Sequence, residues 1–236
     1  MRKQLLYSFF FLQQLLLCVT ISAAELKPST LQTKGKASNQ LSKADLEHGA
    51  IQINRLLKDR PELATLISKG DGAYEWIRLN FAGEYTGFRI YWENSKPYID
   101  ADGENRFDDF NHTGAIRVKK PSISDAPGNA EIQCMAVVYE LINIRNTPRF
   151  TALWNDALNG KLTRSEWVRG NTLLEFEAIH ETKNFYSKIW FPLMTSKHLR
   201  ADEHLWRVEA ADTFDSWLHT KDAEKFIQYW KSCYPS

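Results

Sequence analysis

The sequence predicts an α+β fold that is mainly helical, with a small sheet, in a single domain over residues 42–236. Apolar residues recur at helical spacing through most of this span. Only two short segments, 87–92 and 115–118, have the pattern that is typical of strands. Clusters of Gly, Pro, Asn and Ser separate these elements, and no stretch is repeated, so a mixed fold of long helices and few strands is expected.

The first 24 residues predict a cleavable secretory signal peptide. Arg2 and Lys3 precede an apolar stretch over 5–21, and small residues end it at Ala24. A membrane anchor is the competing interpretation, but a pair of glutamines interrupts the run, which is also short for a bilayer. We therefore expect cleavage after Ala24 and a secreted or periplasmic protein that has no membrane contact once the signal peptide is removed.

The composition of the chain excludes several classes of partner. Lys and Arg total 30 against 29 Asp and Glu, and no block of basic residues points to nucleic acid or to anionic lipid. Residues 25–41 are rich in Lys, Ser, Thr and Gln and are predicted to be a disordered linker. There is no glycine-rich phosphate loop and no dinucleotide fingerprint, so we expect no cofactor.

The first half of the domain is predicted to contain both strands. Three helices come first, at 42–58, in a short segment from Pro61, and at 73–81. The strands at 87–92 and 115–118 follow, separated by an acidic loop over 100–111.

The second half is predicted to be helical. A buried helix covers 130–146, and a separate helix begins at Pro148 and ends at Asn159-Gly160. Thr163 and Glu166 form the pattern of a capping box. They open a long helix that is expected to run to about Trp190, where Pro192 breaks it. Short helices are expected between 201 and 234.

One pentapeptide on the buried helix is similar to a zinc-peptidase motif. A thermolysin-type peptidase places His-Glu-x-x-His on a buried helix, so that both imidazoles face one ion, and a later helix adds a carboxylate. Here the matching positions read Tyr139-Glu140-Leu141-Ile142-Asn143. The long helix follows with Leu173-Leu174-Glu175-Phe176-Glu177-Ala178.

With these motifs, the segment 115–190 resembles a family of zincin-like metallopeptidase domains found in secreted bacterial proteins and toxins. The resemblance implies a small sheet, a buried helix and a long second helix in zincin-like order. It also implies that Glu177, or alternatively Glu175, occupies the position of the third ligand.

The sequence departs from that family at both histidines. Neither Tyr139 nor Asn143 is a normal zinc ligand, so the resemblance implies a domain without a metal, a non-catalytic pseudo-metallopeptidase that binds a protein or peptide partner. An ordinary buried helix, whose polar residues satisfy one another, explains the same pattern. A second functional hypothesis is a secreted hydrolase with an active site near Glu140, Glu177 and His180.

Two cysteines remain after removal of the signal peptide, Cys134 and Cys233. In an oxidising compartment an even pair predicts one disulfide. Alternatively, Cys134 is a buried apolar thiol on a helix. Both possibilities stay open, because spacing alone does not show that two cysteines meet in space.

The predicted acidic loop is a candidate for calcium binding. Asp100, Asp102 and Glu104 supply oxygen ligands of the kind that calcium prefers. Gly103 falls at the fourth place and Asn111 at the twelfth, so the segment is not the helix–loop–helix calcium loop. A plain acidic surface loop is the alternative interpretation.

Overall fold

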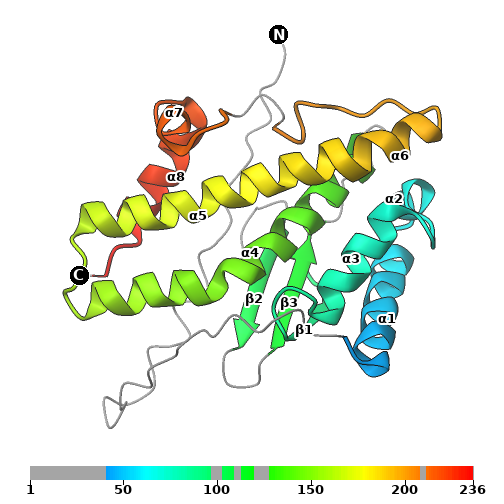
Figure 1. Ribbon diagram of the computed structural model, residues 1–236, viewed down its shortest axis with the longest axis horizontal. Coiled ribbons are helices and arrows are strands. Elements are labelled where there is room, and N and C mark those ends of the chain that lie inside the picture. The colour runs from blue at the N-terminus through cyan, green and yellow to red at the C-terminus, as the bar shows by residue number, and fades with distance from the viewer. Residues whose placement is uncertain (1–40, 97–102, 109–112, 120–127, 208–210, 236) are drawn as a thin grey trace.

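The computed structural model describes residues 41–96, 103–108, 113–119, 128–207 and 211–235. The predicted signal peptide and all but the last residue of the predicted linker lie outside these ranges. Over the described residues the protein is mainly helical, with a small three-stranded mixed sheet, which confirms the predicted fold class (Figure 1). None of the helices in these ranges combines the length and the apolar character needed to cross a bilayer.

Three helices begin the domain, as predicted: α1 (Lys43–Asp59), α2 (Pro61–Leu66) and α3 (Gly72–Ala82). A capping box opens α1, because the side chains of Ser42 and Asp45 each accept a hydrogen bond from the other's backbone N–H. Helices α1 and α3 pack closely at Gly49. A Cβ atom at this position would lie 2.2 Å from the carbonyl oxygen of Arg78, so only glycine permits the contact.

The sheet contains β1 (Arg89–Trp92), β2 (Gly103–Asp108) and β3 (Thr113–Val118) in the order β1-β3-β2. Strand β3 pairs with β1 in parallel and with β2 in antiparallel orientation. The prediction of an acidic loop over 100–111 is wrong for the residues of β2. This strand is polar along its length, and pairing with β3 holds it in place, with Glu104 opposite Arg117 and Asn105 opposite Ile116.

Side chains of α1 cover the outer edge of β1. The His48 imidazole donates from Nε2 to the carbonyl oxygen of Ile90 at 2.9 Å, and the backbone N–H of Trp92 donates to Gln52 Oε1 at 3.0 Å. His48 and Gln52 lie one helical turn apart, so they match alternate residues of the strand. Helix α1 thereby takes the place of a fourth strand at this edge.

Helix α4 (Gly128–Leu158) is continuous for 31 residues. The prediction that a separate helix begins at Pro148 is therefore wrong. Pro148 has no N–H for the carbonyl of Ile144, which favours a bend rather than a break where tertiary packing holds both halves. Figure 1 shows α4 bending along its length.

Helix α5 (Arg164–Phe185) begins at the predicted capping box of Thr163 and Glu166. The prediction that Pro192 ends the long helix is wrong. A π-helical turn over Tyr186–Trp190 widens the spiral, and α6 (Phe191–Ser196) continues from it. Pro192 then falls at the second residue of α6, directly after the π-helical turn, and the helix continues through it.

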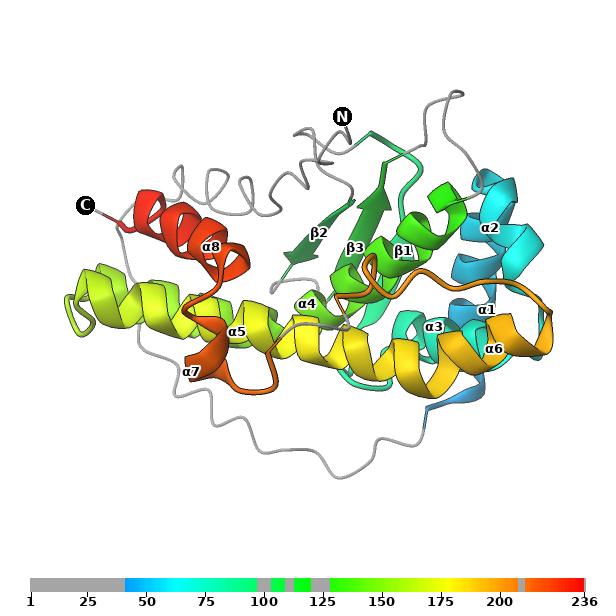
Figure 2. The ribbon, with the colours of Figure 1, turned by 90° about the horizontal axis from the view of Figure 1, so that it is seen from above.

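The elements form layers in which α4 lies between the sheet and α5 (Figure 2). Two short helices of the chain end, α7 (Phe214–Trp217) and α8 (Lys221–Ser232), pack against α5. The core is rich in aromatic side chains, and the following Trp side chains are fully buried: Trp92, Trp167, Trp190, Trp206, Trp217 and Trp230. A smaller apolar cluster, which includes Phe150, Trp167 and Trp230, joins the ends of α4, α5 and α8.

Candidate functional site

Helices α4 and α5 meet through a hydrogen bond between two motif residues. The Tyr139 hydroxyl donates to Glu175 Oε2 at 2.6 Å, and both side chains are buried. Burial raises the pKa of Glu175 to about 7, against the lowering effects of the Tyr139 hydrogen bond and the nearby positive charge of Arg207. Trp230, on α8, lies near the Glu175 carboxylate and also lowers its pKa.

Glu140 lies next to Tyr139 on α4 and faces β2. It is 0% exposed, and Asn105 Nδ2 donates to its Oε2 at 2.6 Å. Burial raises the pKa of Glu140 to about 8; the Asn105 hydrogen bond lowers this pKa, whereas the negative charge of Glu175 raises it further. At neutral pH the motif glutamate is therefore mainly a neutral carboxylic acid.

Asn143 occupies the second histidine position and is also 0% exposed. Within the described ranges its side-chain amide has no hydrogen-bond partner. Gln133 lies on the same side of α4 as Glu140 and is also buried, and its side-chain amide has no hydrogen-bond partner within these ranges either. Mutual hydrogen bonding among the polar residues of this helix therefore does not extend to Asn143, and this side of α4 has unused hydrogen-bonding capacity within the described residues.

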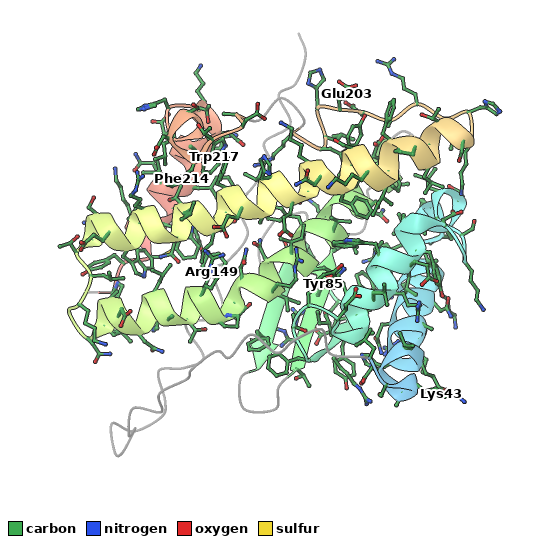
Figure 3. The ribbon with its side chains drawn as sticks, viewed as in Figure 1. Lys43, Tyr85, Arg149, Glu203, Phe214 and Trp217 are labelled. Carbon is green, nitrogen blue, oxygen red and sulfur yellow. The ribbon has the colours of Figure 1, made fainter. Side chains whose placement is uncertain are left out.

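Glu177 does not join this group. It forms an ion pair with Arg149, whose Nη2 donates to Glu177 Oε1 at 3.1 Å. Figure 3 shows Arg149 between the ribbons of α4 and α5. Of the two carboxylates considered for the third-ligand position, Glu175 meets Tyr139 and Glu177 does not, because residues two apart on a helix point to nearly opposite sides.

The residues of the hydrolase hypothesis are not assembled. Glu140 is enclosed between α4 and β2, whereas Glu177 is held in its ion pair at the surface. The ring of His180 packs against Phe176, with ring centroids 5.8 Å apart. These three residues therefore do not form one acid–base cluster.

Metal binding finds no support in the described part of the chain. No group of three or more His, Cys, Asp or Glu side chains there is placed to hold an ion. Of the calcium candidates, Asp100 and Asp102 lie outside the described residues. Glu104 lies on β2, with its carboxylate 3.7 Å from the guanidinium of Arg117, a cation that opposes the binding of another.

Both cysteines are free thiols in the structure. Cys134 is completely buried on α4 within the main core, and burial raises the pKa of its thiol well above the usual value. Cys233 follows α8 and packs against the smaller apolar cluster. Of the two alternatives left open for Cys134, the structure has the buried apolar thiol.

A third buried carboxylate, Glu131, was not singled out from the sequence. It accepts hydrogen bonds from the indoles of Trp190 and Trp206, each at 2.7 Å, and from the backbone N–H of Asp202 at 3.1 Å. The signal available for it was an acidic residue on an apolar helix in a chain rich in tryptophan, whose indole N–H groups need acceptors when buried. Its role is to fix the segment after α6 to the start of α4.

The motif residues thus form an internal hydrogen-bonded cluster, defined here as Tyr139, Glu140, Glu175 and Asn105. Their side chains are buried and donate to or accept from one another. The carboxylates of Glu140 and Glu175 are shielded from solvent. Their hydrogen bonds join α4 to β2 and to α5. The chain matches no protein-family model, and no curated protein and no solved structure is significantly similar to it.

Proposed function

We propose that the mature chain is an exported, non-catalytic binding domain on a pseudo-metallopeptidase-like scaffold. The observation that carries the proposal is the 2.6 Å hydrogen bond between Tyr139 and Glu175. It joins the first histidine position of the peptidase motif to the carboxylate of the following helix. In a zinc site, the same two positions would be joined through the ion.

The lengths of the side chains support this replacement. An imidazole is shorter than a phenol, and zinc lies about 2 Å beyond its ligand nitrogen. An ion held by histidine at position 139 would therefore lie near the present hydroxyl oxygen of Tyr139. The Tyr139 phenol thus fills the space that an imidazole and a zinc ion would fill together. Its hydroxyl gives Glu175 the bonding partner that the ion would otherwise be.

The state of Glu140 argues against catalysis at this position. A general base must be ionised at the working pH and within reach of the water or substrate that it deprotonates. Glu140 is 0% exposed, and burial raises its pKa to about 8. Its carboxyl group is also hydrogen-bonded to Asn105. A binding role therefore fits the chain better than a hydrolase.

The double substitution Tyr139→His and Asn143→His tests the proposal. Two imidazoles one helical turn apart, together with the Glu175 carboxylate, form a competent set of zinc ligands. We expect the folded double variant to bind zinc stoichiometrically in equilibrium dialysis, whereas the parent does not.

Matched controls identify the carboxylate. Adding Glu175→Gln to the double variant should abolish zinc binding, and adding Glu177→Gln should leave it unchanged. A folded double variant that binds zinc no better than the parent would show that the two helices do not converge as in a zincin, and the proposal would be abandoned. Stoichiometric zinc in the purified parent would contradict it equally.

A further inference from the structure

A second region of the molecule has an open cleft. It lies between the first half of α5 and the last turns of α8, closed at one side by Leu218 after α7, and its volume is about 730 Å³. This volume falls in the range of roughly 300–1,000 Å³ that is usual for small-molecule sites. None of the residues of the internal hydrogen-bonded cluster lines it.

Between the cations, the cleft is lined by apolar side chains and by neutral polar ones, which are Ser165, Thr172, Gln228 and Ser232. Val168, Leu218 and Ile227 supply the apolar surface, and Thr172 is completely buried beneath it. The Thr172 hydroxyl has no hydrogen-bond partner among the residues in the described ranges. By contrast, Thr182 on the same helix donates to the carbonyl oxygen four residues earlier, at 2.8 Å. The Thr172 hydroxyl is enclosed below the lining of the cleft and has almost no accessible surface, so it is not a contact for a ligand.

The rim of the cleft is positively charged. Arg164, Arg169 and Lys231 line it, and no carboxylate does. Arg164 donates to the backbone carbonyl of Lys231 at 2.7 Å, which holds both residues at one end of the cleft. Within the described part of the chain, neither of these two side chains is paired with a carboxylate. A rim of a single sign raises the local concentration of anions.

Arg169 is held on the other side of the rim. Its guanidinium lies over the ring of Phe214, 5.0 Å from the centroid, and pairs with Asp215 at 3.0 Å. Figure 3 shows Phe214 and Trp217 of α7 beside α5, where they form the wall behind this contact. The ion pair is open to solvent on both sides, and Asp215 offsets the charge of Arg169, so the net positive charge of the rim rests on Arg164 and Lys231.

We propose that this cleft binds a small amphiphilic monocarboxylate, with its head at Arg164 and Lys231 and its apolar chain over Val168 and Ile227. The cationic rim complements the carboxylate, and the floor complements the chain. The inference goes beyond the proposed function and concerns a separate surface, so either can fail without the other.

Isothermal titration calorimetry of the mature chain with sodium decanoate tests the inference. Decyltrimethylammonium and decanol serve as probes with the same chain and with opposite or no charge. We expect saturable binding of one decanoate per chain, at least about tenfold weaker binding of decanol, and no binding of the cation. Equal affinity for decanoate and decanol would overturn the proposal, because it would show apolar adsorption without recognition of the head group.

Two variants locate the site. Lys231→Gln keeps the backbone carbonyl that Arg164 contacts, so its fold should be intact, and decanoate affinity should fall by about tenfold. Arg149→Gln removes a cation outside the cleft and is the matched control, which should bind decanoate like the parent. Unchanged affinity in Lys231→Gln, or an equal loss in both variants, would overturn the assignment of the ligand to this cleft.

Discussion

The internal hydrogen-bonded cluster and the basic cleft differ in what their polar groups are free to do. In the cluster, Tyr139 and Glu175 are occupied by each other, and Glu140 is occupied by Asn105, all away from solvent. In the cleft, Arg164 and Lys231 face solvent at the rim of an open space. The residues that resemble a catalytic motif are thus bonded to one another inside the protein. The cationic residues at the cleft belong to no recognisable sequence motif.

Helix α5 contributes residues to both the internal hydrogen-bonded cluster and the cleft, so the two regions lie close together. Thr172 and Glu175 lie one turn apart on α5, the first at the floor of the cleft and the second in the cluster. Helix α8 separates the two regions: its Trp230 lies near Glu175, while the next residue, Lys231, lines the cleft. Packing of the chain end against α5 therefore encloses Glu175 and leaves the charged side chains of the rim open to solvent.

The largest expected effect concerns the pH dependence of stability through Glu140. Its pKa rises from 4.5 to about 8 on folding, so the folded state holds a proton that the unfolded state releases over that range. This contribution to stability is fully present below about pH 4.5 and is lost as pH rises through about 8. The shift corresponds to roughly 4–5 kcal/mol.

Urea denaturation at several pH values between about 5 and 8.5 measures this effect. The parent should lose stability as pH rises, and Glu140→Gln, which keeps an acceptor for Asn105 and does not titrate, should lose less; the slope that remains comes from Glu175, whose pKa burial raises to about 7. Two outcomes would show that Glu140 is not an enclosed carboxyl group. One is a parent whose free energy of unfolding does not change with pH over this range, and the other is a Glu140→Gln variant with the same pH dependence as the parent.

A smaller effect should separate Glu175 from Glu177. Glu175→Ala leaves the buried Tyr139 hydroxyl without its acceptor and should lower the free energy of unfolding by about 1–3 kcal/mol. Glu177→Ala removes an exposed ion pair with Arg149 and should cost less than about 1 kcal/mol. Chemical denaturation of both variants at one pH makes the comparison. Equal losses would show that the two carboxylates are not differently placed.

The smallest effect distinguishes two threonines of α5. Thr172→Val removes a buried hydroxyl that has no partner in the described ranges, and it should change stability by less than about 0.5 kcal/mol. Thr182→Val removes a hydroxyl that donates to Ala178 and should cost about 0.5–1.5 kcal/mol. Thermal unfolding of the two variants is the measurement. A larger loss in Thr172→Val would mean that its hydroxyl is already bonded inside the protein.

Features that depend on local chemistry could be predicted from the sequence. The capping box at Thr163 was predicted because it is complete within four residues, and the start of α1 after Ser42 was predicted as well. Strand β2 was missed because its polar residues are fixed by β3 and by Glu140 on α4, which are remote in the chain. The breaks expected at Pro148 and Pro192 were wrong because packing carries the helices through both prolines.

The candidate site was only partly predictable for the same reason. The buried helix and the position of Glu140 follow from apolar periodicity, and they are found as expected. The choice between Glu175 and Glu177 depends on the rotation of α5 relative to α4, which the sequence does not encode locally. The cleft could not be anticipated, because it forms only when α8 packs back against α5.

The central claim is that the motif glutamate is an enclosed neutral acid rather than a catalytic base. An NMR titration that follows the side-chain carboxyl carbons of ¹³C-labelled glutamate tests it most directly. The account predicts one carboxyl group that titrates near pH 8 and disappears in Glu140→Gln, and another near pH 7 that disappears in Glu175→Gln. If every glutamate of the parent titrates below about pH 5, as solvated carboxyl groups do, then the cluster is open to water and the account is contradicted.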